Sequence, residues 1–357
     1  MKCPFKISLR FLILFLSPLL SLATEKFDEK IANFKNLLSH LEPTLKASIF
    51  SLSGQHYNFF YAGEKVTPES QFYIGSVSKH ITAFMLLKTL KQKNPTQDLK
   101  ELLQAPLLIT FLYSKLLRKI DKAWVEKISL LDLLTHYSGL SEFIDEYQYN
   151  EQKKLALNNP IESLQILQSV KFNPTKPYLY SNTNYFLIAE LMEELQNDSY
   201  EQLFQKFVKE PANMMDSYAP SGGNYHSFKQ DPHFKELQPN LNTEIFLDFK
   251  NAKGCGGIIS TANDMAKWNH YFYTQVEPEL RSIMLSNYGA DKDGTSMNLG
   301  LGTEKTSVEI IGAQGEQDSY LSSIGYLPPY DLSYVILSNN YQDYKKLMSV
   351  WKKQVLE

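Results

Sequence analysis

The sequence predicts an α+β protein in which an antiparallel sheet, formed from both ends of the chain and flanked by helices, surrounds an inserted, mostly helical subdomain. Aromatic segments with strand character flank the turn Ser53-Gly54, and further strand-like segments lie near the C-terminus. Residues 97–215 between them carry a mostly helical pattern that prolines interrupt. Strands at both ends around a helical middle favour one sheet that both ends of the chain share.

Length and charge limit the function classes. With 357 residues and 43% apolar content, the chain can bury a large core. The formal net charge is −3, and it becomes −6 when three cations near the N-terminus (Lys2, Lys6 and Arg10) are left out. This balance disfavours nucleic acid or an anionic membrane surface as the main partner. The sequence does not indicate an oligomeric state.

Residues 1–23 have the pattern of a signal peptide. The three basic residues precede the apolar run Phe11–Leu22, and Ser21-Leu-Ala23 supplies small residues for cleavage. The run is short for a membrane span, which favours cleavage over an uncleaved anchor. We therefore expect an exported protein, periplasmic or secreted, without a stable membrane anchor after signal removal.

The remaining chain, 24–357, is interpreted as one domain with an α/β part (about 24–95 and 255–357) and a helical part (about 96–254). We expect the irregular loop at 216–253 and, at Leu107–Tyr113, a buried helix rather than a lid or lipid-contacting patch. The α/β part is expected to hold a helix, a hairpin, four late strands and a closing helix. The predicted segments are Phe27–His40, Lys46–Leu52, His56–Tyr61, Met297–Gly302, Val308–Ile311, Tyr320–Tyr326, Leu332–Leu337 and Tyr344–Val355.

The strongest chemical signal is Gly75-Ser76-Val-Ser-Lys79, which runs into an apolar helix. Residues three apart share a helix face, so the hydroxyl of Ser76 and the amine of Lys79 can meet locally. An amine held in apolar surroundings can act as a base, and a serine beside it is a candidate acyl-transfer nucleophile. The same spacing at Ser349 and Lys352 lies in a charged helix and is interpreted as accidental.

A second candidate site is Tyr180-Ser-Asn182, which a proline-bearing loop delivers to the start of another helix. The phenol of Tyr180 can take the proton from Ser76 or activate a water. The amide of Asn182 offers both a donor and an acceptor, suited to a substrate amide or to ordering Lys79. Taken alone, this triplet is more typical of an aromatic anchor followed by a helix-capping asparagine.

Cysteine and histidine usage adds no further chemistry. Cys3 leaves with the signal segment, so no internal disulfide is expected, and Cys255 among glycines is interpreted as a small buried thiol. No metal or cofactor motif is present, and His226 and His233 in the expected loop are interpreted as solvated. We expect no cofactor and no metal.

Four ordered motifs carry a resemblance to a known family. The chain resembles the serine β-lactamase and penicillin-binding-protein superfamily, in its class C β-lactamase, D,D-peptidase and esterase branch, over residues 47 to 340. The resemblance implies a β-lactamase/transpeptidase-like fold. The motifs are Gly75-Ser76-Val-Ser-Lys79, Leu133-Leu-Thr-His136-Tyr-Ser-Gly139-Leu, Tyr180-Ser-Asn182 and Gly256-Gly257-Ile-Ile-Ser-Thr-Ala-Asn-Asp264.

The likeness implies roles for the site residues. Ser76 would be the acylated nucleophile, with Lys79 and Tyr180 as the proton-handling pair, and either of the two remains a candidate for the acylation base. Asn182 would contact the substrate, and the Ser76 N–H would form half of an oxyanion hole. The His136 segment and Gly256–Asp264 would be structural elements.

The third motif of the family departs from its pattern here. The family places Lys or His, a small residue and Gly on an inner strand, whereas the best match is Ala313-Gln314-Gly315, followed by Glu316. Gln314, Gly315 and Glu316 are the predicted substrate-binding residues, with the Glu316 N–H completing the oxyanion hole. Ala313 removes a cation that would bind a substrate carboxylate, a bond of about 1.5–3 kcal/mol. This puts efficient turnover of penicillins and D-Ala-D-Ala ends in doubt.

Two functions of different classes follow. The first is a serine hydrolase that forms an acyl-enzyme on Ser76 with a small-molecule or peptide acyl donor, an ester or amide. The second is a non-catalytic binding or interaction protein that kept the scaffold. The sequence has no Gly-x-Ser-x-Gly elbow, which excludes the usual α/β-hydrolase site.

Overall fold

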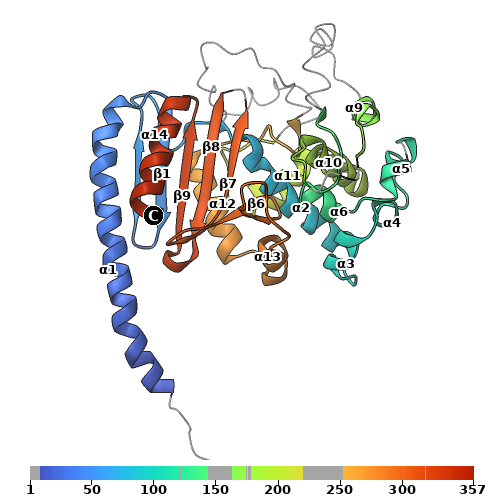
Figure 1. The fold of residues 1–357 in the computed structure, drawn as a ribbon. Helices are drawn as coiled ribbons and strands as arrows, with labels where there is room; N and C mark the ends of the chain where they lie inside the picture. Colours follow the sequence, from blue (N-terminus) through green and yellow to red (C-terminus); the bar gives the residue numbers. More distant parts are fainter. Residues whose placement is uncertain are drawn as a thin grey trace, which may run out of the picture.

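A seven-stranded antiparallel sheet organises the chain (Figure 1). The computed structural model describes residues 9–120, 122–143, 163–173, 175, 178–219, 252–317 and 319–357, with side chains from residue 25 onward. The order of the sheet is β2-β1-β9-β8-β7-β6-β5. The strands are β1 (Ser48–Gly54), β2 (Asn58–Ala62), β5 (Ser296–Asn298), β6 (Leu301–Lys305), β7 (Glu309–Gln317), β8 (Tyr320–Leu327) and β9 (Leu332–Ser338).

The two ends of the chain meet in the middle of this sheet. β1 pairs with β9 along its whole length, with Ser48 opposite Ser338 and Gly54 opposite Leu332. β9 in turn pairs with β8, so the two N-terminal strands, β2 and β1, continue into the five C-terminal strands without a break. The predicted α+β class and the shared sheet are confirmed. The predicted strand at Met297–Gly302 is two strands, β5 and β6, that turn at Gly300.

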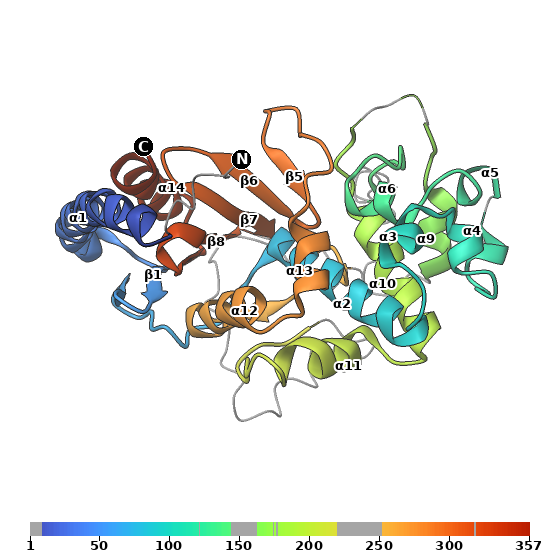
Figure 2. The same ribbon diagram turned by 90° about the horizontal axis from the view of Figure 1, so that it is seen from below.

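One face of the sheet is covered by the first and last long helices, α1 (Leu9–Leu41) and α14 (Tyr341–Trp351), which lie side by side in both views (Figures 1 and 2). Phe34 of α1, Phe50 of β1 and Trp351 of α14 form a buried aromatic cluster with ring centroids 4.8–5.2 Å apart. Burying such rings contributes about 1.5–3 kcal/mol each. The predicted terminal helices are therefore the cover of this face.

The other face packs against α2 (Ser78–Lys93) and α12 (Ala262–Thr274), beyond which lies the helical part. The side chains of α2 are buried almost all round, as its apolar sequence predicts. The remaining elements are η1 (Glu42–Thr44), β3 (Phe72–Tyr73), η2 (Gly75–Val77), α3 (Leu99–Gln104), α4 (Leu107–Thr110), η3 (Leu117–Lys119), α5 (Lys122–Val125), α6 (Leu130–Leu134), α9 (Ser163–Ser169), α10 (Asn182–Gln196), α11 (Tyr200–Phe204), η5 (Gln205–Lys209), β4 (Ile259–Ser260), α13 (Pro278–Leu285), η8 (Pro328–Tyr330) and η9 (Lys352–Leu356).

One helix prediction is wrong in part. The segment Leu107–Tyr113 forms only the four-residue helix α4, in which Leu107 is buried, and Phe111 is buried just beyond it. Ile109 and Leu112 are exposed because the short helix ends at Thr110 and turns its other face outward. Most of the expected loop at 216–253 lies outside the described residues.

No helix in the described part of the chain combines the length and the apolar character that crossing a membrane requires. The described part of α1 begins at Leu9 and therefore includes the backbone of most of the predicted signal segment. The expected cleavage after Ala23 stays a prediction.

Two buried histidines make the stability of this fold sensitive to pH. Burial lowers the pKa of His80 to about 3, and its ring packs edge-on against Trp268 and Phe272. In the unfolded chain a histidine takes up a proton near pH 6.5, whereas folded His80 stays neutral down to about pH 3. The contribution of neutral His80 to the free energy of unfolding is thus fully present above about pH 6.5. It is lost as the pH falls, by up to roughly 1.4 kcal/mol per pH unit.

We predict that His80→Phe flattens the fall in unfolding free energy between pH 6.5 and pH 4.5, although it lowers stability at neutral pH by removing the bond of the ring to the Leu299 backbone. Urea denaturation at several pH values measures this slope. The variant His270→Asn alters an exposed histidine and should keep the original slope. An unchanged slope in His80→Phe would contradict the assignment.

Candidate active site

Ser76 lies where a short strand turns into the buried helix α2. β3 pairs with β4, the Ile74 N–H donates to the carbonyl of Ile258, and the chain then enters the 3-10 turn η2. Gly75 takes the left-handed φ of +48° at this turn, a conformation that favours glycine. This local geometry places the Ser76 hydroxyl at the head of α2.

Lys79 occupies the first turn of α2, and its side chain is the centre of the site. It is only 3% exposed, and its Nζ donates three hydrogen bonds. The acceptors are Ser76 Oγ at 2.9 Å, Asn182 Oδ1 at 2.7 Å and the Cys255 carbonyl at 2.7 Å. An amine at this depth would be costly without partners, and these three use all the donors of an ammonium group.

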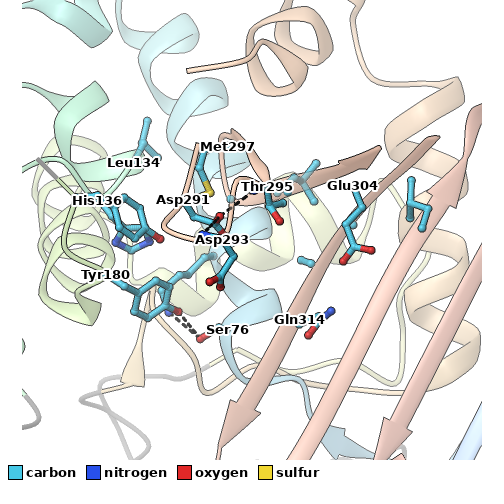
Figure 3. Close-up of a pocket in the computed structure, with 18 of the residues that line it drawn as sticks. Ser76, Leu134, His136, Tyr180, Asp291, Asp293, Thr295, Met297, Glu304 and Gln314 are labelled. Carbon is cyan, nitrogen blue, oxygen red and sulfur yellow. Dashed lines mark hydrogen bonds between the residues drawn. The ribbon is translucent and has the colours of Figure 1, made fainter. Parts of the chain in front are cut away.

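Tyr180 is the second side chain that contacts the hydroxyl of Ser76. Its hydroxyl donates to Ser76 Oγ at 2.7 Å, and its ring lies 5.0 Å from Lys79 Nζ. Figure 3 shows Tyr180 and Ser76 side by side at one end of the cavity. Tyr180 is 44% exposed, so this phenol is open to molecules entering from solvent. Three residues that the sequence singled out thus meet at one oxygen atom.

His136 lies directly behind the Tyr180 ring. The two rings stack at 4.4 Å with an interplanar angle of 27°. The Nδ1 of His136 accepts a hydrogen bond from the Ser181 N–H at 3.2 Å, and its carbonyl accepts one from the Leu179 N–H. Burial, with the nearby Lys79 charge, lowers the pKa of His136 to about 3, so the ring is neutral. This histidine braces the segment that carries the phenol and does not touch Ser76.

Asn182 is the first residue of α10, and its position explains its contact with Lys79. Its backbone N–H donates to the carboxylate of Glu142 at 2.6 Å, an arrangement that satisfies a free amide at the helix start. Its side-chain oxygen is thereby turned towards Lys79. Of the two roles that the sequence left open, the structure shows the ordering of Lys79, and the substrate contact stays a prediction.

The predicted third motif lies on β7, against the turn that carries Ser76. A Cβ on Gly315 would come within 2.3 Å of the Ile74 oxygen and 2.7 Å of the Ser76 nitrogen. A Cβ on Gly75 would come within 2.7 Å of the Glu316 nitrogen. The pairing of β6 with β7 ends at Gly312, so the edge of β7 beyond this point is left to the serine turn. The amide of Ser76 in η2 and the amide of Glu316 in β7 therefore lie on two backbone segments that pack directly against each other.

A cavity of about 410 Å³ opens in front of these groups. Ser76, Lys79, Tyr180, Ala313 and Gln314 line it, whereas Asn182, Gly315 and Glu316 do not. No sequence motif marks several other lining residues, which come from loops, from strands and from helix α10. These are Tyr178, Tyr185, Asp291, Asp293, Thr295, Met297 and Glu304.

The sequence profile of the Beta-lactamase family matches residues 52–354 of this chain, which cover most of the sheet, the residues that line the cavity and the site residues described above. The chain belongs to the Beta-lactamase family. The resemblance that the four motifs carry is confirmed.

Curated relatives of this family member include teichoic acid D-alanine hydrolases of Staphylococcus aureus. The protein of strain NCTC 8325 / PS 47 is 24% identical over 295 residues, which cover 75% of this chain and 65% of that protein. The protein of strain MRSA252 is 25% identical over 254 residues, which cover 66% and 55%. The chain thus spans less than two thirds of the length of these relatives.

Solved structures with the same fold include two amide hydrolases. A D-amino acid amidase from Ochrobactrum anthropi SV3, complexed with D-phenylalanine, superimposes with a TM-score of 0.70 at 17% identity, covering 92% of this chain and 99% of that one. A D-stereospecific amidohydrolase from Streptomyces sp. gives 0.67 at 17% identity, with 88% and 97% coverage. These similarities show the fold of this family member.

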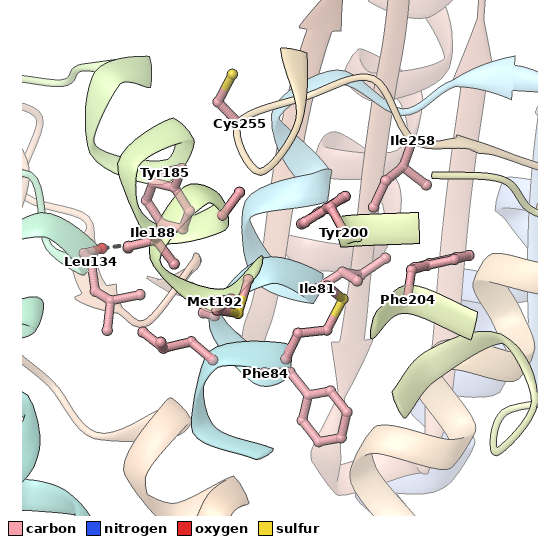
Figure 4. Close-up of a cluster of buried hydrophobic side chains, with 14 of the residues drawn as sticks. Ile81, Phe84, Leu134, Tyr185, Ile188, Met192, Tyr200, Phe204, Cys255 and Ile258 are labelled. Atoms are coloured by element: carbon pink, nitrogen blue, oxygen red, sulfur yellow. Dashed lines mark hydrogen bonds between the residues drawn. The ribbon is translucent and has the colours of Figure 1, made fainter. Parts of the chain in front are cut away.

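Cys255 and the glycines beside it are structural, as the sequence predicts for the thiol. Burial raises the pKa of the Cys255 thiol to about 11, so it stays protonated at neutral pH. Figure 4 shows it among buried side chains of α10 and α11, and its carbonyl serves Lys79. The Gly257 N–H donates to Gln317 Oε1 at 2.8 Å, which fastens this loop to β7. In the described part of the chain no cluster could hold a metal, and His226 and His233 lie outside it.

The brace on Tyr180 is testable. His136 adopts a φ of +61°, which asparagine tolerates, so His136→Asn should preserve the turn while removing the stack. We predict a roughly tenfold lower rate of acylation of Ser76 by a fluorophosphonate, with a melting temperature within a few degrees, because the phenol loses its fixed position. Labelling time courses followed by mass spectrometry measure this. The distant variant His56→Asn should label at the original rate, and equal rates for both variants would contradict the bracing role.

Proposed function

We propose that this protein is an exported serine hydrolase that forms an acyl-enzyme on Ser76 with ester or amide substrates. The observation that carries the proposal is the convergence of Lys79 Nζ and Tyr180 OH on Ser76 Oγ, at 2.9 and 2.7 Å, in the wall of a cavity. A nucleophile and two proton-transfer groups within hydrogen-bond reach are what acyl transfer requires. The signal-peptide pattern of residues 1–23 supports export to the periplasm or medium.

The reaction has two steps. Ser76 Oγ attacks the carbonyl carbon, and whichever of Lys79 and Tyr180 is unprotonated accepts the serine proton. The tetrahedral intermediate collapses, the bond to the leaving group breaks, and the pair returns the proton to the leaving oxygen or nitrogen. A water then attacks the serine ester, its proton passes to the pair, and Ser76 regains a proton as the carboxylic acid product leaves.

In this proposal, the backbone around Gly75 and Gly315 stabilises the negative charge that forms on the carbonyl oxygen of the substrate. The amides of Ser76 and Glu316 are the two donors of the proposed oxyanion hole, and the close approach of β7 to the serine turn sets their spacing. Each such donor contributes about 2.7–4 kcal/mol to the transition state. Ser322 Oγ donates to the Ile74 carbonyl at 2.7 Å and holds the two segments together.

The substrate is proposed as a small-molecule or peptide acyl donor. The names of the relatives, a D-alanine hydrolase of teichoic acid and a D-amino acid amidase, support esters and amides of amino acids. Peptidoglycan-derived peptides and β-lactams are the further candidates that the family suggests. Their carboxylate would meet Ala313, which offers no charge, in the wall of the cavity.

The second candidate function is a non-catalytic binding protein on the same scaffold, and the uncharged Ala313 is the observation that favours it. The two functions differ in one outcome. A hydrolase forms a covalent adduct at Ser76, whereas a binding protein forms none.

We predict a stoichiometric fluorophosphonate adduct, detected by intact-mass spectrometry, that Ser76→Ala abolishes. Ser78→Ala is the matched control, because this neighbouring hydroxyl is buried and makes no hydrogen bond within the described ranges of the chain. Its loss should leave labelling intact, since removing a buried hydroxyl without a partner is nearly neutral for stability. Labelling that survives in Ser76→Ala, or its absence from the original protein, would refute the nucleophile.

We further predict that Ala313→Lys raises the rate of acylation by penicillin roughly tenfold, because the new ammonium can bind the carboxylate of the drug. Ala313→Met supplies similar length without charge and should give no such gain. Stopped-time mass spectrometry of the penicilloyl adduct measures both rates. Equal rates in the two variants would show that position 313 does not face the substrate carboxylate.

A further inference from the structure

The charges in the cavity wall are unbalanced. The ionisable acids and amines that line it are Lys79, Asp291, Asp293 and Glu304. Lys79 has given its three donors to Ser76, Asn182 and the Cys255 carbonyl, so none is left for a substrate. Within the described residues, the cavity therefore offers no free cation to a carboxylate in the substrate.

The three carboxylates differ in how many hydrogen-bond or ion-pair partners they have in the protein. Glu304 is paired with Lys352 at 3.2 Å. Asp291 Oδ1 accepts the N–H groups of Asp293 and Thr295, both at 2.9 Å. Asp293 has neither a side-chain hydrogen bond nor an ion pair in the described part of the chain, and it is exposed. A charge that lines a reactive cavity and has no partner of its own is available to a ligand.

The loop that carries this carboxylate is held in place. The Tyr137 hydroxyl donates to the Ala290 carbonyl at 3.1 Å, and the Met297 N–H donates to the Gly289 carbonyl at 2.8 Å. In Figure 3 Asp293 projects from this loop towards the end of the cavity where Tyr180 and Ser76 lie. The negative charges of Asp291 and Asp293 also affect the ionisation of Tyr178 in the cavity wall. Burial, followed by the charge of Asp291, raises the pKa of Tyr178 to about 12, and Asp293 adds to this rise.

We propose that the cavity selects acyl donors that carry an ammonium group, with Asp293 as the residue that binds it and Asp291 as a second negative charge beside it. This inference rests on the proposed hydrolysis at Ser76 and names the substrate class of that site. A carboxylate near the scissile bond would meet the negative charges of Asp291 and Asp293, and Lys79 has no donor left to bind it. An ammonium group would instead gain a charge-assisted bond. Glycosyl or acyl chains without charge would be neither favoured nor rejected on this ground.

Three matched donors test the proposal: D-alanine 4-nitroanilide, its N-acetyl form and its N-succinyl form, which present an ammonium, a neutral amide and a carboxylate. We expect kcat/KM to be roughly tenfold higher for the ammonium donor than for the neutral one, and lowest for the succinyl donor. Raising the salt concentration should narrow the difference, because ions screen an exposed carboxylate. A neutral or anionic donor that is hydrolysed faster than the ammonium donor overturns the proposal.

The variant Asp293→Asn locates the effect. The ratio of the ammonium to the neutral rate should fall towards one, a readout that a general loss of activity does not move. Glu309→Gln removes the same charge from an exposed position at the start of β7 outside the cavity, and it should keep the ratio. A ratio that persists in Asp293→Asn overturns the assignment of the residue.

A second measurement covers the case in which the anilides are not turned over. D-alaninamide and its neutral analogue D-lactamide are compared as protectors of Ser76 against the fluorophosphonate. The cationic amide should protect at a roughly tenfold lower concentration in the original protein and not in Asp293→Asn. Equal protection overturns the charge selection while the labelling itself upholds the hydrolase, whereas absence of labelling refutes the proposed function.

Discussion

The buried amine of Lys79 is the constraint on which the site depends. A donor at this depth must be satisfied within the protein, because an unpaired polar group in the interior costs several kcal/mol. Its three acceptors come from three separate parts of the chain: the turn before α2, the start of α10 and the loop before α12. Satisfying one side chain therefore requires the sheet part and the helical part to be docked correctly.

A second constraint acts at the opposite side of Ser76. The serine turn and β7 approach so closely that Gly75 and Gly315 have no room for a side chain. The same contact brings the backbone of Ser76 and the backbone of Glu316 close together, where the proposed oxyanion hole would lie. Gly315, a substrate-binding residue by prediction from the sequence, lies against the backbone of Ile74 and Ser76. The proposed oxyanion hole would then be positioned by folding and would need no rearrangement when a ligand binds.

The parts that the sequence predicts well are those in which a local pattern fixes the answer. Ser76 and Lys79 are one helical turn apart, so their meeting follows from spacing alone. The turn at Leu327-Pro-Pro-Tyr-Asp331 separates the last two strand-like segments, which is enough to place β8 and β9 within one residue. The failures have a different cause. The length of α4 depends on the tertiary position of Leu107 and Phe111, which are buried. The exposed apolar residues beside them made a longer buried helix look favourable in the sequence. Asp291 and Asp293 stand in a loop without a motif, and only the folded chain brings them to the cavity.

The departure in the third motif and the acidic loop then become parts of one arrangement. A site that keeps Ser76, Lys79 and Tyr180 but exchanges a cation for Ala313 has not lost its reactive oxygen, since Lys79 and Tyr180 reach Ser76 from elsewhere. What changes is the charge that a substrate meets next to that oxygen. Replacing the cation by alanine would leave the cavity neutral towards ligands only if the surrounding acids were absent. Among the described residues, Asp293 lines the cavity and has no partner of its own. In the proposed enzyme, the chemistry at the serine and the selection of its substrate are carried by different residues, so the second can change while the first is retained.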